Sequence, residues 1–408
     1  MRVLIVSQYF WPENFRINDL ARGLVERGHN VTVLTGIPNY PAGTFFPGYG
    51  FFRNLRQDYH GVKVKRVPLI PRGDARGINL ALNYVSYAFF ACIFSPFICR
   101  ERYDLIFVCQ LSPVTVGLPA LFLKKLKKIP VVFWILDLWP ESLSATGAVK
   151  SPNILRWVDK LVRFIYRGCN LILTSSKGFI PCVASKGVAA EQTRYFPNWN
   201  EPEYLVEERS AELPKGVVLP QGFRVMFAGN IGVAQDFDTI LSAAEKLRDF
   251  TDIKWIVLGD GRQSEWVAEQ IKSRGLINAV HLLGRHLPET MPAFFAQADA
   301  MLVTLRKEPI FELTVPGKIQ SYMACGKPIV AAVDGEGGRI IIESGAGLAA
   351  SSGDADALAQ SVLDMYRLPR EEREAMGMRG QQFCADNFDR DMLINRLEGW
   401  MGEVVAAR

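Results

Sequence analysis

Eighteen residues, Val315 to Ala332, combine the residue types best suited to binding an anion. A Pro316-Gly317-Lys318 turn is followed by a short helical pattern, a glycine at position 326 and an apolar run. This order predicts a loop that opens into the N-terminus of a helix within an α/β repeat. The unpaired N–H groups and positive dipole end of such a helix bind anions, and Lys318 adds a full charge beside them. The segment therefore predicts a diphosphate site, and the plainer alternative is an ordinary βα turn of a doubly wound domain.

Three glycine turns in the same half of the chain would let a backbone approach that diphosphate. Each follows an apolar run, and their sequences are Phe227-Ala-Gly-Asn-Ile-Gly232, Leu258-Gly-Asp-Gly261 and Leu283-Gly-Arg285. One such turn is a weak signal, because glycine punctuates most βα connections. Together they predict a shared ligand edge at the carboxyl ends of their strands, with these candidate contacts: Gly229, Asn230, Gly232, Gly259, Gly261, Arg262, Gly284 and Arg285.

The elements that must position these residues are two runs of βα units. Apolar runs recur at residues 3–6, 31–34, 105–108, 131–135 and 171–173, and again at 225–228, 255–258, 280–283, 300–303 and 329–332. Strands that alternate with helices predict a parallel sheet with helices on both faces, so we expect an α/β protein of two doubly wound, Rossmann-like domains.

We expect domains at 1–200 and 201–385, with a C-terminal helix at 386–408 crossing back to the first domain. The polar, proline-dotted stretch 198–222 is the predicted linker. Two such domains would face each other across a cleft at the carboxyl ends of their strands, where ligands bind.

Composition and charge narrow the functional classes. The chain has 408 residues, of which 49% are hydrophobic and 22% charged, as expected of a globular protein. Residues 1–200 carry 25 Lys and Arg against 11 Asp and Glu, whereas 201–408 carry 22 against 31. The basic half predicts an anionic partner, and a phospholipid surface or a pyrophosphate-bearing lipid is favoured because we find no nucleic-acid motif.

The seven cysteines are odd in number and scattered, which argues against a disulfide framework or a zinc site and favours a reducing cytoplasm. The first 35 residues follow a strand, loop, helix, strand pattern, so we expect no cleavable signal peptide.

The stretch from Gly77 to Cys99 contains no charge in 23 residues. Its length would span a bilayer, but its Asn and Ser residues and Pro96 predict a polar side, as in an amphipathic helix lying in the membrane interface. A plain core helix and a true span are the alternatives. Two neighbours support a membrane contact: the uncharged aromatic loop 38–52 and the lysine cluster 124–128, which a solvated helix end would also explain.

The 315–332 segment resembles the family 4 retaining glycosyltransferases, in which Pro-Gly-Lys and Tyr-Met-Ala-x-Gly-Lys-Pro line the sugar-nucleotide site. The glycine turns match the family in order and spacing. Three further segments resemble members that assemble bacterial surface polysaccharides, and they are Gln8-Tyr-Phe-Trp-Pro-Glu13, Asp137-Leu-Trp-Pro-Glu-Ser142 and Phe196-Pro-Asn198. The similarity is greatest to the N-acetyl-L-fucosamine transferases of O-antigen and capsule synthesis, and it implies a GT-B fold.

Two departures from the family pattern concern the expected site. Family members usually carry two glutamates eight positions apart, where this chain has Leu313 and Ser321. Glu312 and Gln320 stand one residue off. Members without the pair occur among polyprenyl-linked sugar transferases, so we interpret the change as a branch difference.

In the glycine turn of the second domain, Asn230 and Gln235 replace the usual Arg and Lys. The resemblance then leaves the charge of the diphosphate to Lys318, Arg285 and either Arg16 or Arg262.

Mechanistically, the family is thought to retain configuration by front-face attack, in which the leaving phosphate takes the proton of the acceptor. We therefore expect Lys318 and Arg285 to stabilise the leaving group. An inverting enzyme would need a base, for which Asp137, Glu141 and His60 are candidates. Asp137 and Glu141 are equally well explained as an N-cap and a first-turn acid, and His60 as a surface histidine.

The candidate acceptor residues in the first domain are Glu13, Asn14, Arg16, His60 and Asn198.

We expect no metal and no other cofactor, because the three Asp-x-Asp pairs at 236, 354 and 389 all stand at predicted helix starts, where Asp caps. The predicted function is retaining transfer of a sugar, possibly an N-acetylated deoxyhexose, from a UDP-sugar to a polyprenyl-diphosphate-linked saccharide. The enzyme would be cytoplasmic and peripheral on the inner face of the plasma membrane. The alternatives are a non-hydrolysing UDP-sugar 2-epimerase and a non-catalytic subunit that binds a lipid-linked saccharide.

Overall fold

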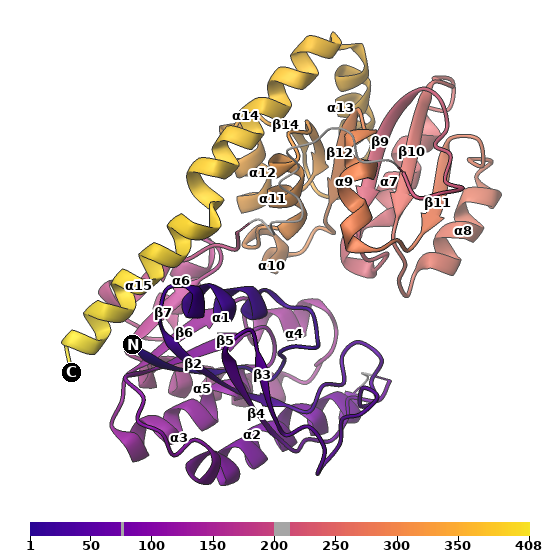
Figure 1. Cartoon of the computed structure of the whole chain (residues 1–408). Helices are drawn as coiled ribbons and strands as arrows, with labels where there is room; N and C mark the ends of the chain where they lie inside the picture. The colour runs from indigo at the N-terminus through magenta and orange to yellow at the C-terminus, as the bar shows by residue number, and fades with distance from the viewer. Residues whose placement is uncertain (75–76, 200–212) are drawn as a thin grey trace. The chain divides into compact units, whose positions relative to one another are not determined.

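The computed structural model describes residues 1–74, 77–199 and 213–408, which form two compact units (Figure 1). The first unit contains residues 1–197 and 391–408, and the second contains 198–390. The predicted boundary at 386 is wrong by a few residues, because it falls inside the helix α14 (Arg370–Phe388). Much of the predicted linker at 198–222 lies outside the described residues.

The first unit is built on a sheet whose described strands run in the order β3-β4-β2-β1-β5-β6-β7-β8. All its pairs are parallel except β3 with β4. The strands are β1 (Arg2–Val6), β2 (Asn30–Gly36), β3 (Arg56–Tyr59), β4 (Val62–Val67), β5 (Leu105–Gln110), β6 (Val131–Ile135), β7 (Leu171–Thr174) and β8 (Thr193–Tyr195).

Helices cover both faces of this sheet (Figure 1). They are α1 (Arg16–Glu26), α2 (Gly77–Ile98), α3 (Gly117–Lys127), α4 (Glu141–Ala145), α5 (Pro152–Gly168), α6 (Phe179–Ser185) and α15 (Arg390–Ala406). The last helix contacts the turn after α1, where Arg27 forms an ion pair with Asp391 at 2.7 Å and the His29 ring is hydrogen-bonded to Glu398 at 2.6 Å.

The hairpin of β3 and β4 was missed because its residues are charged. Lys65 and Arg66 are buried within β4, where Lys65 pairs with Glu101 and Arg66 donates to Gln57 at 2.7 Å. A charged run lacks the apolar pattern that predicts a parallel strand, so these partners could be found only in the structure.

The helix predicted over 77–99 is present as α2, but its polar side faces the protein. Asn83, Ser86 and Ser95 are buried, and Asn83 accepts a hydrogen bond from Gln8 at 2.7 Å. The expectation of a water-facing polar side is therefore wrong, and the large apolar side chains of α2 face outward instead. By length and composition, α2 is the one described helix apolar enough to cross a membrane.

The second unit has a parallel sheet in the order β11-β10-β9-β12-β13-β14. Its strands are β9 (Phe223–Ala228), β10 (Ile253–Leu258), β11 (Val280–Gly284), β12 (Ala300–Thr304), β13 (Ile329–Ala332) and β14 (Gly347–Ala350). Its helices are α7 (Phe237–Lys246), α8 (Ser264–Ser273), α9 (Met291–Ala296), α10 (Pro309–Glu312), α11 (Gly317–Ala324), α12 (Gly335–Glu343), α13 (Ala355–Arg367) and α14.

Alternate residues of the β9 strand enter different cores, because successive side chains of a strand point to opposite faces. Val225 and Phe227 pack with α7 and α13, whereas Met226 and Ala228 pack with α11 and α14. The structure thus confirms the doubly wound α/β architecture predicted for both halves of the chain.

Candidate functional site

The carboxyl edge of the second sheet carries all the turns that the sequence singled out. The strand order reverses direction between β9 and β12, and ligands of doubly wound sheets bind at such a reversal. The loops after β9, β10 and β11 and the N-terminus of α11 all lie at this edge. We call it the glycine-loop edge, defined by residues 229–232, 259–262, 284–285 and 316–318.

Backbone hydrogen bonds join the three glycine loops to one another. The N–H of Gly229 donates to the carbonyl of Leu258 at 2.8 Å, and the N–H of Gly259 donates to that of Gly284 at 2.7 Å. Ile231 donates to Asp260 at 2.9 Å. The predicted turns therefore form one continuous main-chain surface.

Three of these glycines have no room for a side chain, and a Cβ on Gly261 would overlap the carbonyl oxygen of Ile231. Gly229 and Gly259 have φ angles of +139° and +133°. A Cβ on Gly259 would overlap the carbonyl of Gly229, and one on Gly229 would lie 2.7 Å from Cε of Lys318. The Lys318 side chain thus runs directly against the backbone of the first glycine loop.

Lys318 has an environment unusual for an ammonium group. It lies in the first turn of α11, and its Nζ is 3.5 Å from the centroid of the Phe227 ring. Nζ is shielded from solvent and has no hydrogen-bond partner among the described residues. Burial lowers the pKa of Lys318 to about 7. A buried donor without an acceptor is costly, and an anion at this position would satisfy it.

Tyr322 fixes α11 against the end of β9. Its hydroxyl donates to the carbonyl of Ala228 at 3.1 Å and accepts from the N–H of Ala228 at 3.0 Å. Phe227 and Tyr322 therefore set the place of Lys318 relative to Gly229. Neither residue was predicted to support Lys318, because buried aromatics are ordinary core residues in a pattern.

The other predicted cations lie further along this edge. Arg285 and Arg262 are exposed. The pKa of Asp260 is lowered mainly by hydrogen bonds from Ser264 and Gly261, and also by the charge of Arg285. Arg285 is thus beside the loop after β10, and two loops separate it from Lys318.

Arg306 was missed, although it is the second residue after β12 at the strand reversal. It is exposed, and its N–H donates to the carbonyl of Ala234 at 2.9 Å. The rule that ligands bind at the carboxyl ends of strands would have indicated it, because residues 300–303 were predicted as a strand.

The remaining predicted residues of this edge make local contacts. The side chain of Asn230 lies over Gly232. The hydroxyl of Ser321 donates to the carbonyl of Gly317 at 3.2 Å, so it is tied to its own helix. Gln320 is buried and donates to the carbonyl of Asn198 at 3.0 Å, while Glu312 is exposed at the end of α10.

The carboxyl edge of the first sheet is built instead from buried side chains. Glu13 is 3% exposed and accepts hydrogen bonds from the N–H groups of Asn39 and Tyr40, both at 2.8 Å. It thereby fastens the loop after β1 to the loop after β2. Burial raises the pKa of Glu13 to about 7, against the effect of these donors. Glu13 is a structural clamp in this arrangement.

An aromatic cluster with one cation lies at the same edge. The guanidinium of Arg72 is 4.9 Å from the ring centroid of Tyr40, and its Nη1 donates to the hydroxyl of Tyr9 at 3.3 Å. The backbone N–H of Arg72 donates to the side-chain oxygen of Asn39 at 3.1 Å. The same oxygen also accepts from the side chain of Asn83 at 3.2 Å. We call this the Arg72 edge, and the sequence did not indicate it because Arg72 follows the unpredicted strand β4.

Asp137 and Glu141 differ in their surroundings. Asp137 precedes α4 without capping it, because the N-cap residue is Pro140, and its carboxylate accepts from the indole N–H of Trp139 at 2.9 Å. Burial raises the pKa of Asp137. Glu141 is a first-turn acid that pairs with the buried Lys186 at 2.8 Å, which favours its structural interpretation.

The prediction that His60 is a candidate base at the acceptor site is wrong. It is exposed in the β3–β4 hairpin turn with a φ of +50°. Because β4 runs parallel to β2, this turn lies at the amino edge of the sheet, beside Val25 near the end of α1. The loops after β1 and β6 are at the opposite edge, so the surface-histidine alternative is the correct one.

The other predicted acceptor residues are dispersed. Asn14 is exposed in the loop before α1, and Arg16 begins that helix. Asn198 belongs to the second unit, where its backbone carbonyl holds Gln320.

Among the described residues, three or more His, Cys, Asp or Glu side chains do not gather as a metal site would require. Asp354 caps α13 by accepting from the N–H of Ala357 at 2.9 Å, and Asp236 is the N-cap residue of α7. The capping interpretation is confirmed for Asp354. The side chain of Asp236 makes no capping hydrogen bond and instead accepts from the hydroxyl of Thr239 at 2.6 Å.

Each of the two units matches a known protein family. Residues 14–199 match the glycosyl transferase 4-like domain, and residues 222–367 match the glycosyl transferases group 1 domain. Together the two models cover most of the chain.

Two relatives of the chain are also named as glycosyltransferases. The chain is 24% identical to Escherichia coli (strain K12) WcaI, which is named as a colanic acid biosynthesis glycosyl transferase, over 80% of this chain and 82% of that protein. It is 29% identical to the glycosyltransferase WbjE of Pseudomonas aeruginosa, over 58% of this chain and 60% of that one.

Solved structures agree on the fold. HepE of Anabaena, crystallised in complex with UDP, has a TM-score of 0.67 at 17% identity and covers 99% of this chain and 100% of its own. Sucrose-phosphate synthase of Thermosynechococcus elongatus has a TM-score of 0.74 at 16% identity, with 100% and 99% covered. The two units are the domains of a GT-B fold. The chain belongs to the GT-B glycosyltransferases and is a glycosyltransferase enzyme of the group 1 type.

Proposed function

We propose that this glycosyltransferase moves a sugar from a UDP-sugar to a polyprenyl-diphosphate-linked saccharide, with retention of configuration. The observation that carries the donor half of this proposal is Lys318 at the start of α11. Its buried ammonium lies against Gly229 and has no hydrogen-bond partner in the described part of the chain. The UDP complex of HepE, which shares the fold, supports a uridine nucleotide.

The leaving group of the reaction would be UDP, and its β-phosphate gains negative charge as the glycosidic bond breaks. Preorganised donors at that phosphate lower the barrier. In our proposal, the free N–H groups of α11 and Lys318 supply them, and Arg285 assists from the loop after β11, further along the same edge. Front-face attack needs no protein nucleophile and no metal, and Asp137 is the remaining candidate base if the reaction inverts.

The proposed acceptor side is the first unit. The Arg72 edge offers a guanidinium between aromatic rings, a combination that binds a phosphate and the apolar face of a sugar. This supports a diphosphate-linked saccharide as acceptor.

The name of WcaI, a colanic acid biosynthesis glycosyl transferase, supports a role in polysaccharide biosynthesis. Within that role we propose bacterial surface-polysaccharide assembly, such as O-antigen or capsule, with an N-acetylated deoxyhexose as the donated sugar. We also propose that the enzyme is cytoplasmic and peripheral on the inner face of the plasma membrane, where a lipid-linked acceptor would lie.

The test is a panel of UDP-sugars incubated with a short-chain prenyl-diphosphate sugar, with the anomeric configuration of the product determined by NMR. We expect one or a few donors to give a product with retained configuration. A product of inverted configuration would contradict the retaining mechanism. Failure of every donor to give a product would contradict the proposed acceptor. Interconversion of UDP-sugars without acceptor would instead support a 2-epimerase, and UDP binding without turnover would support a non-catalytic subunit.

A further inference from the structure

The outer side of α2 exposes large apolar side chains at helical spacing. Leu82, Val85, Phe89, Ile93 and Phe97 all face outward, and Phe89 and Phe97 are 58% and 63% exposed. The polar residues Asn83 and Ser86 are buried on the opposite side of the helix. A helix with its apolar stripe turned to solvent lacks its partner, since exposed apolar patches mark interaction sites.

The neighbouring helices α3 and α5 extend this apolar surface. The α2 helix packs against α3, and α3 packs against α5 (Figure 1). Phe122 and Leu126 are exposed on α3, while Trp157 and Phe164 are 70% and 61% exposed on α5. We call this three-helix surface the α2/α3/α5 face.

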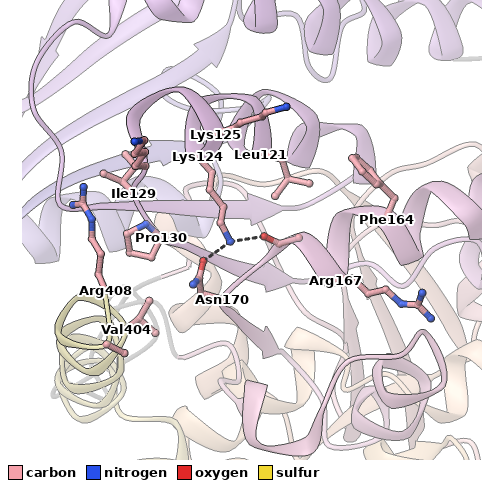
Figure 2. Close-up of a pocket in the computed structure, with 13 residues that line it drawn as sticks. Leu121, Lys124, Lys125, Ile129, Pro130, Phe164, Arg167, Asn170, Val404 and Arg408 are labelled. Atoms are coloured by element: carbon pink, nitrogen blue, oxygen red, sulfur yellow. Dashed lines mark hydrogen bonds between the residues drawn. The ribbon is translucent and has the colours of Figure 1, made fainter.

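A basic pocket adjoins this face where α3 and α5 end (Figure 2). Its volume is about 720 Å³, and its lining includes Phe164 together with five cationic side chains: Lys124, Lys125, Lys128, Arg167 and Arg408. None of its thirteen described lining residues is acidic. Two carboxylates of the surrounding elements are engaged elsewhere, because Glu101 pairs with Lys65 and Asp159 with Lys186. Glu403, next to the lining residue Val404, is exposed and does not line the pocket.

Two of these cations are held in place by the protein. Lys124 donates to the carbonyl of Gly168 at 2.8 Å and to the side chain of Asn170 at 2.7 Å, as Figure 2 shows. Lys125, Lys128 and Arg167 are exposed. Arg167 also donates to the carbonyl of Lys186 at 3.1 Å. The pocket therefore joins two anchored charges to the exposed Lys125 and Lys128, an arrangement that suits a phosphate anion.

We propose that the α2/α3/α5 face docks on an anionic phospholipid bilayer and that the basic pocket receives a phosphate headgroup. The apolar side chains enter the acyl boundary, with Trp157 at the interface, where tryptophan is favoured. The lysines and arginines meet the negative surface. This inference deepens the proposed function, because an acceptor carried by a membrane lipid requires the enzyme to reach the bilayer.

Sedimentation of the full chain with lipid vesicles tests this inference. Vesicles of equal parts phosphatidylglycerol and phosphatidylcholine should pellet the protein, and vesicles of phosphatidylcholine alone should pellet little. The double variant Lys125→Gln/Lys128→Gln should lower the partition coefficient about 30-fold, since each basic residue near an anionic surface contributes roughly 1 kcal/mol. The matched control Lys215→Gln/Lys272→Gln removes two exposed lysines of the second unit and should bind as wild type.

The apolar part is tested by Trp157→Ser, with Trp266→Ser, on the exposed side of α8, as its control. Only the first should weaken vesicle binding. Equal binding to both vesicle types, or an unchanged Lys125→Gln/Lys128→Gln variant, would overturn the proposal. Binding of inorganic phosphate by the protein in solution, together with equal binding to both vesicle types, would show a site for free phosphate instead and would also overturn the proposal.

This assay uses neither donor nor acceptor, so its failure is distinct from failure of the proposed function. The Lys125→Gln/Lys128→Gln variant should retain wild-type turnover on a water-soluble short-chain acceptor. Loss of that turnover together with normal vesicle binding would contradict the assignment of these lysines to the membrane.

Discussion

The carboxyl edges of the two sheets, one in each unit, are built from different parts of the chain. The glycine-loop edge of the second unit is a main-chain surface, in which Gly229 and Gly259 leave room for a ligand and Lys318 is the one buried cation among the described residues there. The Arg72 edge of the first unit is a network of side chains fastened by the buried Glu13. The difference suggests that the donor diphosphate is bound by backbone geometry and the acceptor by side-chain identity.

The largest expected effect comes from Lys318→Met. We predict a loss of kcat/KM of about 10² to 10³, as for removal of a preorganised oxyanion donor. The same change should raise the thermal midpoint of the free protein at neutral pH, because it removes a buried amine without a partner, worth about 1–3 kcal/mol. Kinetics and thermal unfolding check both effects.

The matched control is Lys327→Met, just beyond the same helix. Lys327 donates to the carbonyls of Ala296 and Ala298 at 2.7 and 2.9 Å, so its loss should lower stability. Stabilisation in both variants, or in neither, would show that Lys318 is an ordinary core lysine.

The clamp of the first unit predicts a pH dependence of stability. Glu13 has a pKa of about 7 in the folded protein against an ordinary 4.5, so the folded state holds this proton while the unfolded chain releases it. The free energy of unfolding should therefore fall by about 3 kcal/mol as the pH rises from about 4.5 to 7. Chemical denaturation of wild type and Glu13→Gln across this range checks it, and the slope should be absent in the variant. A wild-type stability that rises over this interval would contradict the burial of an uncompensated carboxyl.

Gly229→Ala tests the main-chain edge directly. Its Cβ would meet Lys318 at a φ of +139°, so we expect donor affinity to fall about tenfold or more. Gly275→Ala is the control, since Gly275 also has a positive φ of +69°, lies outside the glycine-loop edge and has open space for a Cβ. Binding of UDP to both variants by calorimetry distinguishes them, and equal losses would argue against a close backbone approach at Gly229.

Arg72→Met should have the smallest effect, and it should act on the acceptor alone. Loss of one charged hydrogen bond predicts an acceptor KM about tenfold higher with the donor KM unchanged. The exposed Arg53→Met is the control. A change in the KM for the donor would contradict the assignment of Arg72 to the acceptor site.

The two edges also differ in how far the sequence predicted them. The glycine-loop edge was predicted nearly whole, because glycine turns and the N-terminus of a helix are local features of the chain. The aromatic support from Phe227 and Tyr322 was not, since their contacts with Lys318 and Ala228 depend on packing between distant segments.

The Arg72 edge was largely missed. It depends on β4, whose buried Lys65 and Arg66 conceal a strand, and on α2, whose polar side turns inward. His60 was misplaced for the same reason, because the antiparallel β3–β4 hairpin that carries it was not predicted. Polar burial is satisfied by partners remote in sequence, so a pattern of hydrophobicity does not reveal it.

The most direct test of the central claim is calorimetric binding of UDP and of uridine to wild type and Lys318→Met. The account predicts that the variant binds UDP at least tenfold more weakly and binds uridine as wild type does, because Lys318 recognises the diphosphate alone. Equal affinity of both proteins for UDP, or an equal loss for uridine, would contradict a diphosphate bound at the N-terminus of α11.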